Sequence, residues 1–302
     1  MTSLSPTMAG IRRRGGRARS YLELTKPRII ELLLVTTVPT MFVAKGGVPP
    51  LGLIALTLLG GALAAGGANA INMVVDRDID RVMHRTRHRP LVTGEVTPVA
   101  ALMFAVALEV AAFAELWAWV NVLSAVLALS ATLFYVFVYT LWLKRTSSQN
   151  IVIGGAAGAV PVLVGWSAVT GTLGWAPLVL FGIIFIWTPP HFWALAIRFR
   201  EDYRDAGIPM LPAVATIERT AVEIIVYSVA LVAVTLVLTP VAHMGVVYTT
   251  AAAVLGMLFL VSAVRLFRDA TPRAAIALFR YSITYLTLLF IAMAADVVLR
   301  WH

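Results

Sequence analysis

The stretch LGLIALTLLGGALAAGGANAINMVVDRDID, residues 51–80, sets the fold of this chain. Residues 51–73 carry no charged side chain, and a helix of about 20 apolar residues is long enough to cross the hydrocarbon core of a bilayer. The run then ends in three aspartates, Asp76, Asp78 and Asp80. We therefore expect a transmembrane helix whose polar end lies at one face of the membrane.

Apolar runs of the same kind fill most of the remaining chain. Of the 302 residues, 60% are hydrophobic and 13% are charged, whereas about a quarter of the residues in a soluble domain are charged. This composition excludes a soluble globular protein. The runs cover 29–44, 51–73, 98–116, 119–142, 151–170, 174–197, 221–241, 245–267 and 277–299. The predicted fold class is an all-α polytopic membrane protein with about nine transmembrane helices in one bundle.

The positive charges predict how the bundle is oriented. If the N-terminus is cytoplasmic, 22 of the 24 Lys and Arg residues fall on the inner side, and only Lys45 and Arg300 fall outside. Such asymmetry is what the positive-inside rule describes, so the net charge of +9 indicates topology, and we expect no nucleic-acid partner. We expect a multi-pass protein of the bacterial plasma membrane, with its C-terminus outside and its active site on the cytoplasmic side.

The N-terminal segment differs from the rest of the chain. Residues 1–20 are polar and rich in arginine, which predicts a disordered basic tail, and 21–302 are then a single transmembrane domain. A mitochondrial transit peptide is an open alternative, because no acidic residue precedes Glu23. The chain has no cysteine, which excludes disulfides, thiolate metal sites and cysteine nucleophiles.

The end of the second apolar run carries a column of polar residues. Asn72, Asp76 and Asp80 are spaced i, i+4 and i+8, so in a helix they share one face with steps of about 6 Å. Oxygen ligands suit Mg²⁺, which typically binds one or two carboxylates together with the phosphates of a substrate. The alternative is a solvated helix end in which the acids pair with Arg77 and Arg81. Asp78 points away from the column, so this alternative is favoured for Asp78.

Arginines follow this column in RVMHRTRHRPLVTG, residues 81–94. Arg85 and Arg89 are again four residues apart, and guanidinium groups suit phosphate oxygens. Acids beside arginines therefore predict a site for a magnesium-bound diphosphate. Topology or lipid headgroups account equally well for Arg81 and Arg87.

Two further inner segments carry candidate residues. Tyr139, Lys144 and Arg145 lie at the inner end of the fourth run, and Asn150 begins the fifth. Lys144 is a candidate to hold a leaving diphosphate, although a flanking lysine is explained as well by topology. The loop RFREDYRD, residues 198–205, contains two acids and a tyrosine that could face the acid column. They are Asp202, Tyr203 and Asp205.

Few ionisable residues lie inside the expected transmembrane spans. His191 lies among aromatic residues, including Trp187, where it could meet a planar porphyrin or be a structural histidine. Glu109 is expected either to make an interhelical hydrogen bond or to contact substrate, and Asp296 to be structural.

Several strings in this sequence resemble one family, the UbiA-type intramembrane prenyltransferases. They are TKPRI at 25–29, NMVVDRDID at 72–80, RTRHRPL at 85–91, YTLWLKR at 139–145, NIVIGGAAGAVP at 150–161, PHFWALA at 190–196 and DYRDAGIPMLP at 202–212. The acidic strings are typical of the whole family, whereas PHFW and AGIPMLP resemble the branch that acts on haem. The second acidic string reads D-x-x-D rather than D-x-x-x-D, so a metal-ligand role for Asp205 stays open.

The resemblance implies an activity. It implies transfer of a farnesyl group from farnesyl diphosphate to the 2-vinyl group of haem b, giving haem O, with Mg²⁺ as cofactor and haem b as a substrate. The implied partners are haem b, farnesyl diphosphate and membrane lipid, with haem A synthase or terminal-oxidase assembly factors as further candidates.

The resemblance also implies the roles of individual residues. Asp76, Asp80, Asp202 and Lys144 would be catalytic, and the three aspartates among them would bind the metal. The substrate-binding residues would be Asn72, Arg85, Arg89, Tyr139, Arg145, Asn150, His191, Trp187, Tyr203, Asp205, Lys26 and Arg28.

Two other functions stay open at this point. The same fold could act on a quinone precursor or on another tetrapyrrole, because fold alone does not choose the acceptor. A transporter could use the acids to couple an ion, but transporters usually place such sites near the middle of the membrane. The acids here lie at one face, which favours an enzyme.

Overall fold

The computed structural model describes residues 16–300, apart from the side chains of 28–34. Within these residues every regular element is a helix, and there is no strand. Most of the predicted N-terminal tail, residues 1–15, lies outside the described residues. Helix α1, Arg17–Thr25, begins inside the stretch assigned to that tail, so the helical part of the chain starts before residue 21.

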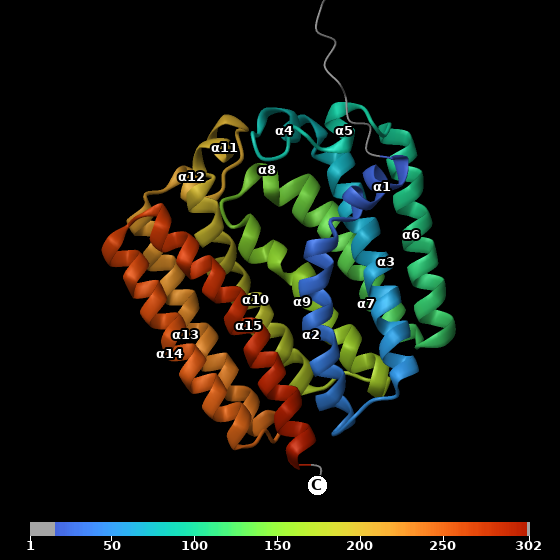
Figure 1. Ribbon diagram of the computed structural model, residues 1–302, viewed down its shortest axis with the longest axis vertical. Coiled ribbons are helices and arrows are strands. Elements are labelled where there is room, and N and C mark those ends of the chain that lie inside the picture. Colours follow the sequence, from blue (N-terminus) through green and yellow to red (C-terminus); the bar gives the residue numbers. More distant parts are fainter. Residues whose placement is uncertain (1–15, 301–302) are drawn as a thin grey trace, which may run out of the picture.

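The long helices coincide with the predicted apolar runs (Figure 1). They are α2 (Pro27–Lys45), α3 (Leu51–Val75), α6 (Pro98–Trp119), α7 (Val122–Leu133) continued by η1 (Phe134–Leu143) and α8 (Lys144–Thr146), α9 (Asn150–Thr170), α10 (Trp175–Arg198), α13 (Ile217–Val241), α14 (Val246–Asp269) and α15 (Pro272–Arg300). Among the described residues, eight of these are long and apolar enough to cross a membrane, with α7 to α8 counted as one. The chain is therefore a multi-pass membrane protein, and α2 corresponds to the further span predicted at 29–44.

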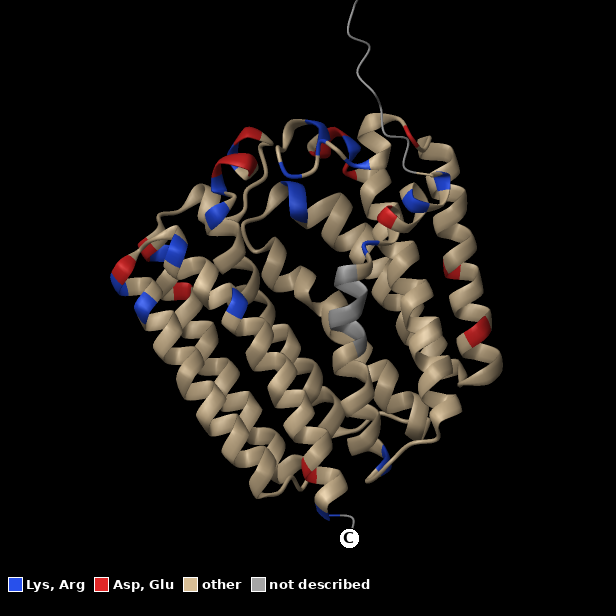
Figure 2. Cartoon of the chain, viewed as in Figure 1, with Lys and Arg blue, Asp and Glu red and all other residues tan. Residues whose placement is uncertain are grey.

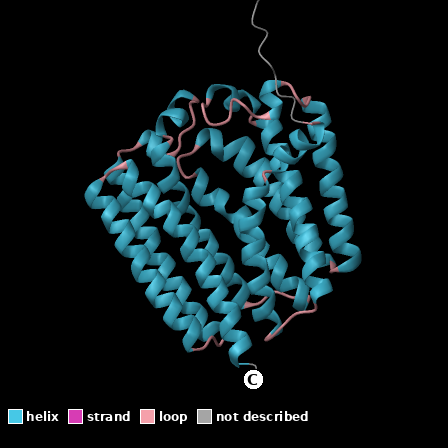
Figure 3. Ribbon diagram, viewed as in Figure 1, coloured by secondary structure: helices cyan, strands magenta, loops and turns pink. Residues whose placement is uncertain are grey.

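Five short helices lie at one end of the bundle. They are α1, α4 (Arg77–Val82), α5 (Pro90–Thr93), α11 (Arg200–Asp205) and α12 (Leu211–Val214). Figure 2 shows that most Lys and Arg residues gather at this end, opposite the end of α15. At the other end the connections are short loops (Figure 3). The charge asymmetry predicted from the sequence thus separates the two ends of the structure.

Glycines let α3 approach α6 closely. A Cβ atom added at Gly67 would lie 2.6 Å from Glu109 Oε1, so only glycine leaves room for that carboxyl group. Small residues at such contacts are typical of helix packing in membranes. Thr132 of α7 donates a 3.1 Å hydrogen bond to Glu109 Oε1. Glu109 therefore makes the interhelical hydrogen bond that was one of its two predicted roles.

Asp296 holds the last two long helices together. Its carboxylate accepts hydrogen bonds from the backbone N–H groups of Gly245 (2.7 Å) and Tyr248 (3.2 Å), at the start of α14. Arg300 lies 2.8 Å from the same carboxylate. A negative charge at a helix N-terminus satisfies N–H groups that lack partners within the helix, so Asp296 is structural.

We predict that Asp296→Ala destabilises the protein by about 3 kcal/mol, because it leaves a buried N–H group, a half-buried N–H group and a cation without their partner. Thermal unfolding in detergent measures the change. Asp269→Ala is the matched control, since Asp269 is exposed at the opposite end of α14, and we expect an effect below about 0.5 kcal/mol. Equal unfolding midpoints for the two variants would contradict the structural role.

Candidate active site

Asn72, Asp76 and Asp80 form a buried column where α3 meets α4. The N–H groups of Asp76 and Asp80 bond to the carbonyl groups four residues earlier, at 2.9 and 2.8 Å. Because this ladder continues through the junction between the helices, the i, i+4, i+8 spacing keeps the three side chains on one face. They are 3%, 0% and 2% exposed. Carboxylates so deeply buried require positive partners.

Each residue of the column has such a partner. Lys26 Nζ donates a 2.8 Å hydrogen bond to Asn72 Oδ1. Lys144 Nζ forms an ion pair with Asp76 Oδ2. Arg89 Nη1 donates to both oxygens of Asp80, at 2.8 and 2.6 Å. The three cations come from separate parts of the chain and converge on one face of α3 and α4.

Lys26 lies in the turn between α1 and α2. Its backbone is left-handed, with φ 52° and ψ 63°, a conformation that a residue with a Cβ adopts at a cost. Burial, together with the positive charges of Arg89 and Lys144, lowers the pKa of Lys26 to about 7. An anion bound among these three cations would favour the charged form of Lys26.

The segment η1 presents a second set of polar groups to the column. It is a π-helix, a rare form that is frequent at functional sites. Asn72 Nδ2 donates to Thr140 Oγ1 at 3.1 Å, and Thr140 in turn donates to the backbone carbonyl of Tyr135 at 2.8 Å. Tyr139 stacks on Tyr135, with ring centroids 5.4 Å apart. Sequence reasoning identified Tyr139 but missed Tyr135 and Thr140, which lie in an apolar run without a charge pattern.

Arg145 lies at the edge of this site. Its guanidinium group bonds to both oxygens of Asp78, at 2.8 and 2.9 Å, and lies 3.9 Å from Asp76 Oδ1. The hydrogen bond from Arg145 lowers the pKa of the Asp78 carboxyl to about 2. Asp78 is 64% exposed and points away from the column, as its spacing predicts, but its partner is Arg145 rather than a neighbouring arginine.

The loop that carries Arg85 touches helix α11 at the charged end of the bundle. The backbone N–H of Arg85 donates a 3.3 Å hydrogen bond to Asp202 Oδ2. The Arg85 guanidinium lies 5.5 Å from the centre of the Phe199 ring. Tyr203 is buried beside Arg85, and this burial raises the pKa of its hydroxyl. Helices α4 and α11 thus lie near one another over the charged end of the bundle (Figure 1).

The acids do not gather into one metal cage. Among the side chains that the structure describes, no group of three or more His, Asp or Glu is placed to hold a single metal ion. Asp76, Asp80 and Asp202 each have a different partner. Asp205 is exposed and borders a surface groove with Asp78 and Arg145, outside the column.

Unsatisfied polar atoms show where a ligand would fit. Asp76 Oδ1 is buried and accepts no hydrogen bond, and neither polar atom of the buried Asn150 side chain has a partner. Buried polar groups without partners are rare in proteins. The carboxylate oxygen of Asp76 that lacks a partner is suited to bind Mg²⁺. Asp80, one helical turn away, and the phosphates of a substrate would be the further ligands. The side chain of Arg28 lies outside the described residues.

His191 lies between α10 and α15, helices that do not carry the acid column. Its Nδ1 lies 2.6 Å from Ser282 Oγ, and its ring stacks on Trp187 with centroids 4.1 Å apart. Trp187 Nε1 donates to the Ser282 carbonyl at 3.0 Å. Phe279 contacts the other side of the imidazole, with centroids 4.8 Å apart. The ring of His191 is therefore fixed in orientation by Ser282 and by these two aromatic side chains.

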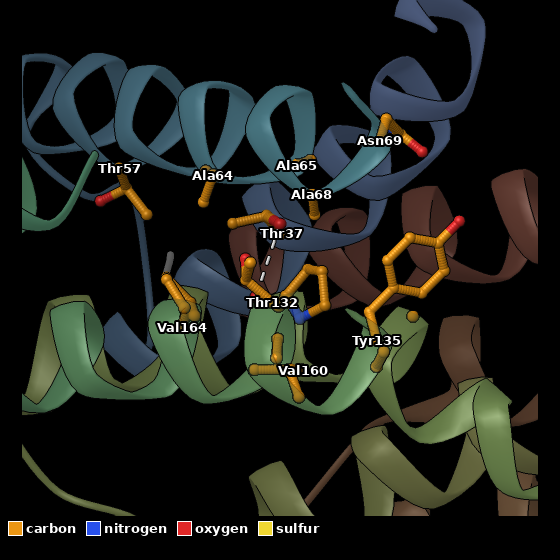
Figure 4. A pocket seen from close by; sticks show the side chains of 16 residues that line it. Thr37, Thr57, Ala64, Ala65, Ala68, Asn69, Thr132, Tyr135, Val160 and Val164 are labelled. Atoms are coloured by element: carbon orange, nitrogen blue, oxygen red, sulfur yellow. Dashed lines mark hydrogen bonds between the residues drawn. The ribbon is translucent and has the colours of Figure 1, made fainter. Parts of the chain in front are cut away.

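An elongated cavity of about 190 Å³ runs into the bundle between α2, α3, α7, η1 and α9 (Figure 4). Asn69 and Tyr135 lie at one end, and Thr57 and Val164 at the other. Asn69 and Thr57 are twelve residues apart on α3, which corresponds to about 18 Å of helix. Half of its lining residues are glycine or alanine: Gly61, Ala64, Ala65, Ala68, Ala128, Ala131, Ala157 and Gly158. Its shape and apolar lining suit a long hydrocarbon chain.

Comparisons with known proteins identify relatives of this chain. The sequence matches the model of the UbiA prenyltransferase family over residues 33–293. A protein of Gloeobacter violaceus named protoheme IX farnesyltransferase is 55% identical to this chain over 297 residues, which cover 98% of this chain and 97% of that protein.

Solved structures share the fold at lower sequence identity. One, described as digeranylgeranylglyceryl phosphate synthase in membranes, gives a TM-score of 0.77 at 16% identity and covers 93% of this chain and 99% of that chain. A UbiA homolog from Archaeoglobus fulgidus bound to GPP and Mg²⁺ gives 0.66 at 20% identity and covers 92% and 99%. The family match over most of the sequence, with a relative at 55% identity, shows that this chain belongs to the UbiA prenyltransferase family.

Proposed function

We propose that this chain transfers the farnesyl group of farnesyl diphosphate to the 2-vinyl group of haem b, giving haem O. The observation that carries the proposal is the buried column of acids and cations at the inner end of an apolar cavity. Such a site can hold a charged diphosphate and a hydrocarbon tail at the same time. The name of the Gloeobacter relative supports farnesyl transfer to haem in particular.

The residues of the column bind the diphosphate. Lys26, Lys144 and Arg89 surround it with positive charge, and these charges stabilise the negative charge that grows on the leaving group. Asp76 and Asp80 would hold Mg²⁺, which when bound neutralises part of the diphosphate charge. The UbiA homolog that binds GPP and Mg²⁺ supports this use of a metal. Asp202 holds the Arg85 loop over the site and completes the enclosure.

The cavity holds the farnesyl tail and limits the access of water. The bond between C1 and the diphosphate oxygen breaks, and its electron pair leaves with the diphosphate. The π electrons of the haem vinyl group then form a new bond to C1. Water adds to the cationic carbon left beside the porphyrin and loses a proton. Farnesyl diphosphate, haem b and water thus give haem O and diphosphate, with the apolar walls protecting the cation before transfer.

His191 is the proposed contact for haem. Its Nδ1 faces Ser282, which directs Nε2 to the opposite edge of the imidazole, and Trp187 offers a flat surface beside it. Imidazole nitrogens commonly bind haem iron. We place the enzyme in the bacterial plasma membrane with the charged end in the cytoplasm, because Lys and Arg gather at that end. Haem A synthase or terminal-oxidase assembly factors are the proposed further partners.

We predict that Asp76→Asn lowers haem O formation at least about 100-fold, because it weakens both the metal site and the partner of Lys144. The assay uses full-length protein in lipid with farnesyl diphosphate, Mg²⁺ and haem b, and detects the product by mass. Asp78→Asn is the matched control, since Asp78 is exposed and points away, and it should keep most of the activity. Near-normal turnover by Asp76→Asn at limiting Mg²⁺ would contradict the assignment.

We predict that His191→Ala weakens haem binding about tenfold or more and leaves farnesyl diphosphate binding unchanged, because α10 and α15 are separate from the acid column. Haem titration followed by its absorbance spectrum measures the first, and diphosphate binding the second. His243→Asn is the control, because His243 is exposed and asparagine tolerates its positive φ of 51°. An unchanged haem spectrum and affinity would make His191 purely structural.

We predict that Arg89→Ala lowers kcat/KM for farnesyl diphosphate by roughly 10- to 100-fold, because the charge that Arg89 meets grows in the transition state. Arg85→Ala and Lys144→Ala should act on the same substrate, and haem affinity should barely change. Arg87→Ala, which removes an exposed arginine from the same loop, should change neither. Equal losses for Arg87 and Arg89 would show that these charges set topology and do not bind substrate.

A further inference from the structure

Tyr135 lies where the charged column meets the apolar cavity. Its ring lines the cavity at the end that also carries Asn69 (Figure 4). Asn69 is three residues before Asn72 on α3, which is about 4.5 Å along the helix axis. A chain whose diphosphate is held at Asp76 and whose tail fills the cavity therefore passes Tyr135 with its first carbons.

The position of Tyr135 is fixed from two sides. Its backbone carbonyl accepts a 2.8 Å hydrogen bond from Thr140 Oγ1, and Thr140 accepts a 3.1 Å hydrogen bond from Asn72. The ring of Tyr139 stacks on it with an interplanar angle of 19°. Tyr139 itself packs where a Cβ atom on Gly154 would collide with it, so only glycine at 154 leaves this space. Two hydrogen bonds thus connect Tyr135 to the acid column, and Tyr139 supports its ring.

The role of Tyr135 that follows from this geometry rests on the proposed farnesyl transfer. We propose that the π face of Tyr135 contacts C1 to C3 of the farnesyl group and stabilises the allylic cation formed when the C1–O bond breaks. The electron pair of that bond leaves with the diphosphate, and the positive charge spreads over C1 and C3. A cation over the face of an aromatic ring is attracted by the ring quadrupole, most strongly where water is absent.

The neighbouring aromatic residues do not share this position. Phe137 of η1 is exposed on the outer surface of the bundle. His191 and Trp187 are held against Ser282 of α15. Tyr139 lies behind Tyr135 in the stack, and it is absent from the cavity lining.

The test separates loss of the ring from loss of the hydroxyl group. Tyr135→Leu should lower kcat about 30-fold, the upper range of a desolvated cation–π contact, and change KM for farnesyl diphosphate less than threefold. Tyr135→Phe keeps the ring and should stay within threefold of the wild type. Phe137→Leu is the matched control on the same π-helix and should behave as the wild type.

A purely structural aromatic side chain is distinguished by a second series. Phenylalanines with increasing numbers of ring fluorines at position 135 keep the shape of the ring but weaken its quadrupole, so the logarithm of kcat should fall linearly with fluorine number. This series tests whether the ring of residue 135 stabilises the cation, even if Tyr135→Leu fails to fold. Equal kcat across the series, or a Tyr135→Leu effect on KM alone, would overturn the proposal.

The readout also separates this proposal from the proposed function. Diphosphate release from farnesyl diphosphate is measured with haem b and without it, because ionisation of the C1–O bond needs no acceptor. If the wild type makes no haem O but releases diphosphate, and the release falls along the fluorine series, the acceptor is wrong and the role of Tyr135 stands. If haem O forms and the series is flat, the function stands and Tyr135 is not the stabilising group.

Discussion

The pairing of two buried carboxylates with lysine and arginine side chains is the interaction on which the rest of this structure depends. Asp76 and Asp80 are withdrawn from water at the end of α3, where an uncompensated charge is costly. Two cations of the column come from elements far from their partners in the sequence: Lys144 is 68 residues from Asp76, and Lys26 is 46 residues from Asn72. The column can therefore form only when α1, α3, the 77–90 segment and α8 have all packed together.

This arrangement also suits the proposed anionic substrate. In the structure the cations bind the carboxylates, and a diphosphate with its metal would enter between them and share both sets of charges. Asp76 Oδ1 already lacks a hydrogen-bond partner, so a ligand there completes an unsatisfied group rather than breaking an existing bond. Groups held in place before substrate arrives need little reorganisation during reaction, which is the main source of electrostatic catalysis.

Packing between the helices serves the same site in a different way. Glycine and alanine side chains on α3, α7 and α9 are too small to fill the space between these helices, and the elongated cavity results. Elsewhere the same small residues bring helices together, as Gly67 does against Glu109. The bundle is thus closely packed between α3 and α6 and open between α3 and α9, where the proposed hydrocarbon tail lies.

The sequence by itself determined the helical spans and the acid column. Both are local properties: an apolar run of bilayer length must be helical because the membrane offers its backbone no other hydrogen-bond partners, and a four-residue spacing puts side chains on one face of that helix. The sequence also placed Asp78 away from the column, for the same reason. It marked Lys144 and Arg89 as candidates through their charge, but not the partner of either.

Only the tertiary structure decided those partners and the residues that join the column to the cavity. Arg145 binds Asp78, His191 binds Ser282 across 91 residues, and Asp202 holds the Arg85 loop across 117. Tyr135 and Thr140 gave no signal, because they lie in an apolar run and Thr140 bonds to the carbonyl group five residues earlier, the spacing of a π-helix. Pairings between distant helices depend on how the helices pack, and packing is a property of side-chain shape in three dimensions that no local spacing contains.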